Sequence, residues 1–257
     1  MKCELCYTCC IKMHDATVPI RVKEWEMAET GSVEGIFSGH GQVKTPTYKE
    51  QAYKLIKEAV LYQKFKPDAI YSQEAICQEL GISRTPVREA LLELQKEGYI
   101  LFCRGKGIQI VSLDQKAIHD ILEMRVYLEK ATAELAARRA TEADVNEIAV
   151  CLDAQHQHLN SQDIDLCYRL DHAFHRAVAR ASHNDLLYQA LDEVLDHYLR
   201  FEVLTIYESY SGASAIWTEH NAIYSAIRAH DPAEAYKAAE LHLQDAYKRT
   251  LEQYWHE

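Results

Sequence analysis

Apolar residues recur three and four positions apart along residues 48–65, which predicts an amphipathic helix with one buried face. The residues expected on that face are Ala52, Leu55, Ile56, Ala59 and Val60. A second, shorter helix is predicted over residues 72–80, opened by Ser72 as its N-cap. Gly81 and Ile82 then supply a tight turn before a third helix.

The third helix is predicted to run from Ser83 to Glu97, and Gly98 suits the left-handed conformation that follows a helix end. The Ser83 hydroxyl is expected to cap the first turn by accepting a backbone N–H. Pro86 lies within that turn, where a missing N–H costs little. The buried stripe of this helix consists of Val87, Ala90, Leu91 and Leu94.

The opposite face of the third helix carries cations close to its N-terminus. Arg84 and Arg88 are one turn apart, so both guanidinium groups leave the same exposed face, with Thr85 beside them. This arrangement suits a helix end in the DNA major groove, where Arg pairs with guanine O6 and N7 and Thr bonds phosphate. These residues alone would equally suit a solvated basic face on an ordinary helix.

Two short β-like runs follow, residues 99–103 and 108–111, joined by the turn Arg104-Gly105-Lys106-Gly107. Such a hairpin can lay the two cations of its tip on phosphates or in the minor groove. Two helices, a Gly-containing turn and a hairpin make a winged helix-turn-helix. The pattern therefore predicts a DNA-binding unit over residues 47–112.

From Asp114 to the C-terminus the pattern is helical throughout, and Gly and Pro occur only at Gly212 and Pro232. Helix starts are indicated by caps or first-turn acids at Asp114, Thr141, Asp185 and Asp231. Helices are predicted over residues 114–121, 122–140, 142–160, 163–182, 184–209, 213–229 and 231–255. They are expected to form an all-α helical bundle over residues 113–257, so the fold class is mainly α.

Residues 1–46 are predicted to be an extension, because four of the nine glycines fall within residues 31–41. Four closely spaced thiols precede them: Cys3, Cys6, Cys9 and Cys10. These are zinc or iron–sulfur ligand types, but the fourth thiol is adjacent to the third, which is poor geometry for one tetrahedral site. A disordered tail and a metal-binding tail both remain open.

The composition bounds the class of protein. A length of 257 residues is ample for two domains. No apolar run approaches the ~20 residues that span a bilayer, so no membrane partner is expected. The first residues do not resemble a secretory signal, which predicts a cytoplasmic protein. In that compartment the eight cysteines are expected to be thiols.

The net charge of −11 at first argues against a nucleic-acid partner, but its distribution removes the objection. Residues 47–112 contain 10 basic and 8 acidic side chains, a net charge of +2. Residues 113–257 contain 13 basic and 25 acidic side chains, a net charge of −12. The acidic excess therefore belongs to the bundle, where it helps to keep that domain off the phosphate backbone.

One group of residues in the predicted bundle has the chemistry of a metal site. Asp171 and His175 are four apart and share a helix face, while His220 and His242 lie on the last two helices. One carboxylate and three imidazoles suit a divalent metal ion, with Zn²⁺, Ni²⁺, Mn²⁺ and Fe²⁺ as candidates. The chain has 13 histidines, so each one alone is more often a core or surface residue.

The DNA-binding unit resembles the winged helix-turn-helix of the GntR family of bacterial transcription regulators. The resemblance rests on the run Ser-Arg-Thr-Pro-Val-Arg-Glu-Ala-Leu at 83–91, on Leu94, on Glu97-Gly98 and on the Gly-rich turn. It implies a double-stranded operator as partner, contacted by Arg84, Thr85, Arg88, Arg104, Lys106 and Gly107. Many members carry an Arg two residues after the Ser that opens the second helix. Here that residue is Glu74, so one contact is expected to be missing or made differently.

The bundle resembles the FCD domain, the ligand-binding domain of the FadR-type branch of this family. The matching residues are Asp171, His175, Ala177, Asn184, Leu186-Leu187, Glu219-His220, Ile223, Ala226-Ile227, Asp231, Ala235 and His242-Leu243. In metal-binding members an Asp and three His in this order hold the ion. The usual Gly before Asn184 is His183 here, so a different turn is expected.

The resemblance further implies a homodimeric regulator that responds to a small organic acid effector bound at the metal. Arg125 lies where such domains often keep an Arg, and it could pair with an anionic effector. Its alternative is an ion pair with Glu129, one turn away. Tyr168 is assigned to the core rather than to the effector cavity. Symmetric dimers read two half-sites, which brings operator affinity into a useful range.

Two other functions remain as alternatives. The first is a regulator that senses the metal itself, with no organic effector. The second is a metal-dependent enzyme on the bundle, for which Glu219 is the only adjacent candidate base. An enzyme would leave the DNA-binding unit unexplained, so no catalytic activity is expected.

Overall fold

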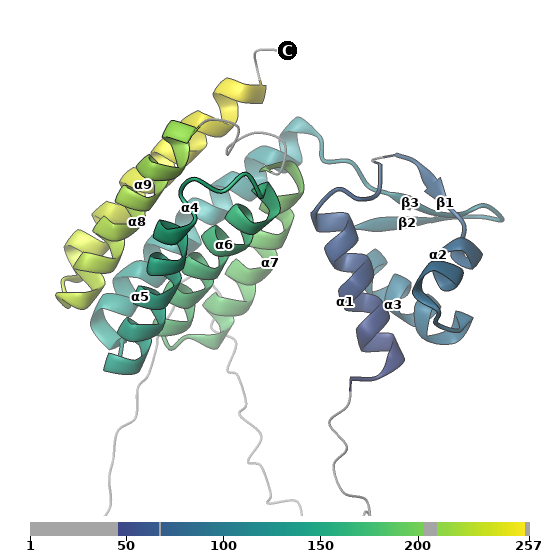
Figure 1. Cartoon of the computed structure of the whole chain (residues 1–257), viewed down its shortest axis with the longest axis horizontal. Coiled ribbons are helices and arrows are strands. Elements are labelled where there is room, and N and C mark those ends of the chain that lie inside the picture. Colours follow the sequence, from purple (N-terminus) through teal and green to yellow (C-terminus); the bar gives the residue numbers. More distant parts are fainter. Residues whose placement is uncertain (1–45, 67, 203–209, 255–257) are drawn as a thin grey trace, which may run out of the picture. The chain divides into compact units, whose positions relative to one another are not determined.

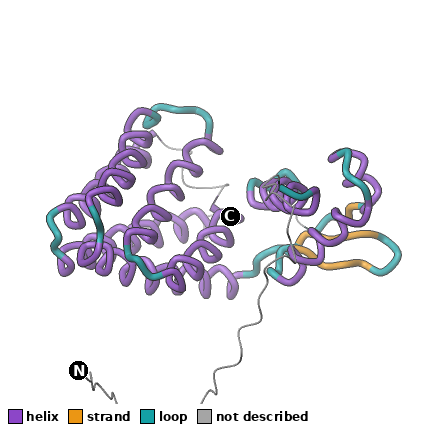
Figure 2. The backbone as a smooth tube through the Cα atoms, turned by 90° about the horizontal axis from the view of Figure 1, so that it is seen from below, coloured by secondary structure: helices purple, strands orange, loops and turns teal. Residues whose placement is uncertain are grey.

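The computed structural model describes residues 46–66, 68–202 and 210–254 (Figure 1). Figure 2 shows that helices dominate these residues and that the strands belong to one small sheet. The mainly α fold class is therefore confirmed. The predicted extension and its four thiols lie outside the described residues, apart from residue 46. None of the helices in the described ranges is both long and apolar enough to cross a membrane.

The DNA-binding unit contains three helices and a three-stranded antiparallel sheet. Its elements are α1 (Tyr48–Leu61), β1 (Ile70–Tyr71), α2 (Gln73–Leu80), α3 (Arg84–Lys96), β2 (Ile100–Cys103) and β3 (Gly107–Ile110). Strand β3 lies between β1 and β2, and Ile108 pairs with both Tyr71 and Phe102. The sequence pattern predicted the β2–β3 hairpin but missed β1, because two residues are too short to show a strand periodicity.

The buried stripe predicted for α3 is confirmed, since its four side chains are all 0% exposed. On α1 the buried residues are Ala52, Ile56, Val60 and Leu61, and Ala59 is half-buried. Leu55 is 49% exposed, so its predicted burial is wrong. Helix α1 also ends at Leu61 rather than at residue 65. Gln63 adopts a left-handed φ of 50°, and the Lys64 N–H donates to the Ala59 carbonyl, which closes the helix in a Schellman motif.

The two helix starts in the helix-turn-helix differ in their caps. The Ser72 hydroxyl accepts a hydrogen bond from the Ala75 N–H at 3.1 Å, as predicted for α2. Ser83 occupies the N-cap of α3, but its hydroxyl makes no cap hydrogen bond, contrary to our prediction. The reason is that Pro86 stands at the third helical position and has no N–H to donate.

The helical domain contains six helices among its described residues. They are α4 (Gln115–Arg139), α5 (Glu142–Gln157), α6 (Ile164–Ala181), α7 (Asp185–Glu202), α8 (Tyr210–Arg228) and α9 (Pro232–Tyr254). Where we predicted two helices over residues 114–140, the structure has α4 alone, because no Gly or Pro interrupts the run. The end predicted for the fifth bundle helix, residue 209, lies outside the described residues.

Small residues let the helices of this domain pack closely. Ala133, Ala137 and Ala177 are buried in a core that also contains Phe174 and Ile227. Helix α4 contacts α6, α7, α8 and α9, so it is the central helix of the bundle. This packing brings side chains from α4, α6, α8 and α9 to one buried point.

Candidate metal centre and nucleic-acid interface

The cations predicted to contact DNA lie on the surface of the DNA-binding unit. Arg84 and Arg88 are exposed at the N-terminal end of α3, with Thr85 between them. Arg104 and Lys106 are exposed in the turn between β2 and β3. The folded unit therefore presents one group of cations at a helix end and another at a hairpin tip, as a winged helix requires.

Glu74 forms an ion pair with one of these cations. Its Oε1 lies 3.1 Å from Arg84 Nη2, and both side chains are more than half exposed. Glu74 is the acidic residue in the first turn of α2, while the first turn of α3 contains none. The sequence pattern identified Glu74 as a departure from the family but did not predict its partner.

Gly107 has a structural requirement that is independent of DNA. Its φ is +125°, and a Cβ at this position would lie 2.1 Å from the Tyr71 carbonyl oxygen of β1. Any side chain would therefore push β1 away from β3. The closeness of the two strands explains the glycine.

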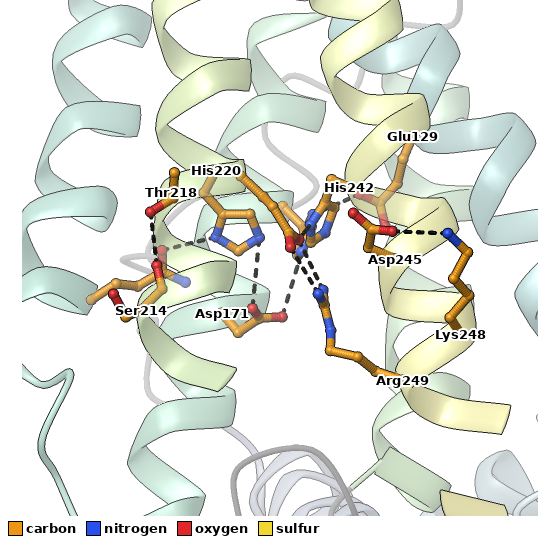
Figure 3. Close-up of polar contacts among 12 residues, drawn as sticks. Glu129, Asp171, Ser214, Thr218, His220, His242, Asp245, Lys248 and Arg249 are labelled. Carbon is orange, nitrogen blue, oxygen red and sulfur yellow. Dashed lines mark hydrogen bonds and ion pairs between the residues drawn. The ribbon is translucent and has the colours of Figure 1, made fainter. Parts of the chain in front are cut away.

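The four residues predicted to bind metal lie together inside the helical domain. Figure 3 shows three of them, Asp171, His220 and His242. One side-chain nitrogen from each of His175, His220 and His242 falls within 4.8 Å of the other two. The Asp171 carboxylate lies 3.5 Å from His175 Nε2 and 3.7 Å from His220 Nε2. All four residues are 3% exposed or less. We call these residues the buried quartet.

Two buried nitrogen atoms of the quartet make no hydrogen bond with any residue that the structure describes. They are the Nε2 atoms of His220 and His242. Buried polar atoms without partners are rare in folded proteins and indicate an ion or water. Two nitrogens that each bind one Zn²⁺ at about 2.0–2.1 Å lie no more than about 4.2 Å apart, so nitrogens within 4.8 Å of one another need only a small approach of the rings to share one divalent ion. The residues present therefore fit a metal ion.

The surroundings of the quartet favour the neutral form of two imidazoles, His220 on α8 and His242 on α9. Burial and the neighbouring imidazoles lower the pKa of His220 well below its ordinary value, and burial likewise lowers the pKa of His242. Burial would raise the pKa of Asp171, but the nearby histidines hold it well below its usual range. A carboxylate beside unprotonated imidazoles is the donor set that a borderline divalent ion prefers.

His175 is subject to opposing influences. Burial alone would lower its pKa, but the Glu129 carboxylate outweighs burial. The pKa is raised to about 9, which favours a protonated ring. Arg125 Nη2 lies 2.9 Å from Nε2, a distance at which the guanidinium can donate only to an unprotonated nitrogen. An ion bound at Nε2 therefore has to displace either a proton or the guanidinium from that atom.

Arg125 is buried and lies beside the quartet. Its Nε donates to Glu129 Oε1 at 2.5 Å, so the ion pair that we considered as its alternative role is present. Its guanidinium also lies 4.2 Å from the centre of the Tyr198 ring. Tyr168 is 0% exposed and belongs to a hydrophobic core, as assigned from the sequence.

Each imidazole also contacts an oxygen through Nδ1, and the sequence pattern missed all three of these partners in that role. The distances are 2.6 Å from His175 to Glu129 Oε2, 2.9 Å from His220 to Gln155 Oε1 and 2.7 Å from His242 to Glu219 Oε2. In each pair the two residues belong to different helices. Only the packing of the helices reveals these contacts, although the adjacent Glu219-His220 pair offered a partial signal.

A pocket opens beside Gln155, the partner of His220. Its empty volume of about 280 Å³ includes open solvent. Its lining is largely apolar and consists of Gln155, His158, Leu159, Cys167, Leu170, Ala213, Ile216 and Trp217. The pocket therefore lies next to a residue that contacts the buried quartet.

Comparison with known protein families identifies both parts of the chain. Residues 48–110 match the family described as bacterial regulatory proteins, gntR family, and residues 120–245 match the FCD domain. These are the domains of DNA-binding transcription regulators. The chain therefore belongs to the GntR family of regulators, in the branch with a C-terminal FCD domain.

Individual relatives agree with this assignment. The chain is 29% identical to the Glc operon transcriptional activator of Escherichia coli over 198 residues, covering 69% of this chain and 78% of the relative. It is 32% identical to a regulatory protein of the same species named for an L-lactate dehydrogenase operon, covering 67% and 74% of the two chains. Both relatives are regulators of transcription rather than enzymes, as we expected for this chain.

A solved structure supports the same fold. The chain resembles E. coli McbR/YncC with a TM-score of 0.73 at 19% identity, covering 82% of this chain and all of the other. At this identity the likeness speaks for the fold alone. The likeness covers both the helix-turn-helix and the bundle.

Proposed function

We propose that this regulator binds operator DNA with an affinity controlled by a small carboxylate effector, which binds at a divalent metal ion in the helical domain. The observation that carries the proposal is the buried quartet, in which two imidazole Nε2 atoms make no hydrogen bond within the described part of the chain. Leaving such atoms unsatisfied is costly in a folded protein, and an ion or a water molecule removes that cost.

Asp171, His175, His220 and His242 are the proposed ligands. Three imidazoles and a carboxylate fit Zn²⁺ best, while Ni²⁺, Mn²⁺ and Fe²⁺ also accept this donor set. An ion that prefers five or six neighbours would retain open positions for an effector oxygen. The ion supplies a positive charge that attracts an anionic effector into an otherwise closed interior.

Arg125 supports an anionic effector. Its guanidinium is buried within 2.9 Å of a proposed metal ligand, where a carboxylate could bond it and the ion together. The name of one relative refers to an L-lactate dehydrogenase operon, and lactate is a small carboxylate.

For DNA recognition we propose that Arg84, Thr85 and Arg88 of α3 contact the operator in the major groove. Arg104, Lys106 and Gly107 would contact it from the wing. One winged helix reads only a few base pairs, so we propose a homodimer that reads two half-sites. The exposure of these four cations supports the assignment, since none of them is needed in a core.

Helix α6 provides a physical route from the quartet to the DNA-binding unit. It carries Asp171 and His175, and the next residue, Arg176, donates to Asp192 at 2.5 Å and Asp196 at 2.6 Å. Asp196 Oδ2 in turn lies 2.9 Å from Lys57 Nζ on α1. We propose that effector binding shifts the population of α6 and α7 positions and thereby alters how the DNA-binding unit engages the operator.

The proposal is tested by measuring operator binding of zinc-loaded and chelator-treated protein, each with and without small organic acids. An effect of acid that requires zinc supports it. A response to zinc alone, with no effect of any acid, would instead support a regulator that senses the metal. An operator affinity that is indifferent to both would refute control through the quartet.

A further inference from the structure

We infer that Glu129, Gln155 and Glu219 are positioning residues that turn all three imidazoles so that Nε2 of each faces one ion. The inference rests on the proposed metal centre and adds a second layer of residues to it. None of the three is a proposed ligand. Each acts on the ion only through the histidine that it contacts.

In all three contacts a side-chain oxygen lies beside the Nδ1 atom of a histidine. Each oxygen lies within 2.9 Å of an Nδ1 atom, so each ring donates its Nδ1–H to that oxygen. A neutral imidazole with its proton on Nδ1 keeps its lone pair on Nε2. The Nε2 atoms of His220 and His242, which make no hydrogen bond among the described residues, are the atoms that this arrangement leaves for an ion.

The positioning residues also fix the helices that carry the ligands. Glu129 of α4 contacts His175 of α6, Gln155 of α5 contacts His220 of α8, and Glu219 of α8 contacts His242 of α9. Each contact therefore joins two helices, and together they hold the three rings in one orientation. Hydrogen-bonded partners of this kind orient metal-bound histidines and raise their basicity.

Glu219 is held more firmly than an isolated acceptor. Arg249 Nη1 and Nη2 each lie 2.8 Å from one oxygen of the Glu219 carboxylate. Arg249 follows His242 by seven residues on α9, so the same helix carries the imidazole and the guanidinium that lie on either side of Glu219. A bidentate pair restricts carboxylate rotation and keeps Oε2 directed at His242 Nδ1.

The charges around the quartet suit a divalent cation. Asp171, Glu129 and Glu219 are acidic, and the pKa of each is lowered because neighbouring cations and imidazoles outweigh the effect of burial. Arg125 and Arg249 compensate two of these three negative charges. The third negative charge is compensated by the protonated His175 ring in the metal-free protein, and a bound cation can take the place of that proton.

The test compares three variants of the full chain: Glu219→Ala, Glu219→Gln and the control Glu240→Ala. Glu240 pairs with Lys130 on the same domain and makes no contact with the quartet among the described residues. The zinc dissociation constant is measured by competition with a chromophoric chelator. We expect Glu219→Ala to weaken zinc binding about 10- to 100-fold and the control to leave it unchanged. Glu219→Gln retains an oxygen acceptor and should recover part of the loss.

A second measurement separates positioning from a general structural role. Nitrogen-15 NMR of the metal-free protein reports which ring nitrogen of His242 carries the proton. We expect Nδ1–H in the parent, Nδ1–H in Glu219→Gln, and a shift toward Nε2–H in Glu219→Ala. Unchanged zinc affinity in a folded Glu219→Ala protein, or an unchanged tautomer, would overturn the inference.

The two proposals fail in different ways. If the parent binds no zinc, or binds it equally well after His220→Ala, the proposed metal centre is wrong. The tautomer of His242 in metal-free protein would still decide whether Glu219 orients the ring. If zinc binding requires His220 but ignores Glu219, the metal centre stands and the positioning role is refuted.

Discussion

The cations proposed to contact DNA are exposed, whereas the proposed metal ligands of the helical domain are residues that are 3% exposed or less. On α3, Arg84 has one exposed ionic partner, Glu74, at 3.1 Å. In the bundle, the Nδ1 atom of each imidazole contacts a side-chain oxygen, which belongs to a carboxylate in two cases and to an amide in the third. Both carboxylates also contact a buried or half-buried arginine. The first site is a set of separate cations, and the second is one connected network.

This difference predicts how each site responds to mutation. Exposed cations contribute to DNA affinity largely one at a time, because water screens them from one another. Members of a buried network depend on each other, because removing one leaves its partner desolvated and unpaired. Substitutions in the bundle should therefore have larger effects than substitutions on the DNA-binding face.

The largest effect is expected for His175→Ala. Loss of one of four proposed ligands should lower the zinc content of purified protein from one ion per chain to a small fraction, measured by elemental mass spectrometry. DNA binding without effector should persist, because the winged helix is unchanged. His183→Ala, which removes an exposed histidine paired with Asp144, serves as the control. Equal zinc in the His175→Ala variant and parent would reject the ligand set.

The next effect is expected for Arg88→Ala. If its guanidinium pairs with a base in the major groove, operator binding should weaken by about 1–3 kcal/mol. Anisotropy titrations with a labelled operator measure the change at fixed salt. The exposed Arg138 of α4 offers a control, and Arg138→Ala should bind as the parent does. Parent-like affinity in the Arg88→Ala variant would argue against the assignment of α3 as the recognition helix.

A smaller effect is expected from acid on the helical domain. Burial would raise the pKa of Glu219, but hydrogen bonds from His242 and Arg249 lower it below the ordinary value of 4.5. A carboxylate with a lowered pKa stabilises the fold above its unfolded pKa, and this contribution is lost as pH falls through the folded value. Metal-free parent should therefore lose more stability below about pH 4.5 than Glu219→Gln does.

Urea unfolding followed by circular dichroism at pH 7 and pH 4 measures this difference. At pH 7 the Glu219→Gln variant should be less stable by about 1 kcal/mol, allowing for the partial exposure of the carboxylate. Glu193→Gln on α7 replaces an exposed carboxylate and should follow the parent at both pH values. Parallel losses in parent and Glu219→Gln would show that this network does not stabilise the fold.

The smallest effect is expected for Glu74→Gln. An exposed ion pair contributes about 0–1 kcal/mol, so thermal stability should barely change. Removing a negative charge beside Arg84 should tighten binding to DNA of any sequence by a similar amount, because it removes repulsion from phosphates. Binding to non-operator duplex is compared with Glu79→Gln, which changes another exposed acid of α2. Weaker binding by Glu74→Gln would contradict this reading.

The sequence predicted best those features that depend on neighbours in the chain. The α3 stripe, the β2–β3 hairpin and the pair Asp171 and His175 follow from spacing within single elements. Prediction from the sequence failed where a contact with a distant residue, or one unusual residue nearby, determines the local structure. Leu55 fits the α1 pattern yet faces solvent, and the Ser83 cap is lost to Pro86.

The partners of the imidazoles illustrate the limit most clearly. Glu129 and His175 are 46 positions apart, and Gln155 and His220 are 65 apart. Their contact depends on the relative rotation of two packed helices, which no periodicity within one helix specifies. Resemblance to the family suggested where the proposed ligands lie, but only the folded bundle shows which oxygens orient them.

Control of DNA binding by the buried quartet is tested most directly by operator affinity in the zinc-loaded full-length protein, titrated with L-lactate and other small carboxylates. The same titration is run with His220→Ala. We predict that at least one acid changes the affinity of the parent and has no effect on the variant. The same response in both proteins, or no response to any acid in the parent, would contradict control through this site.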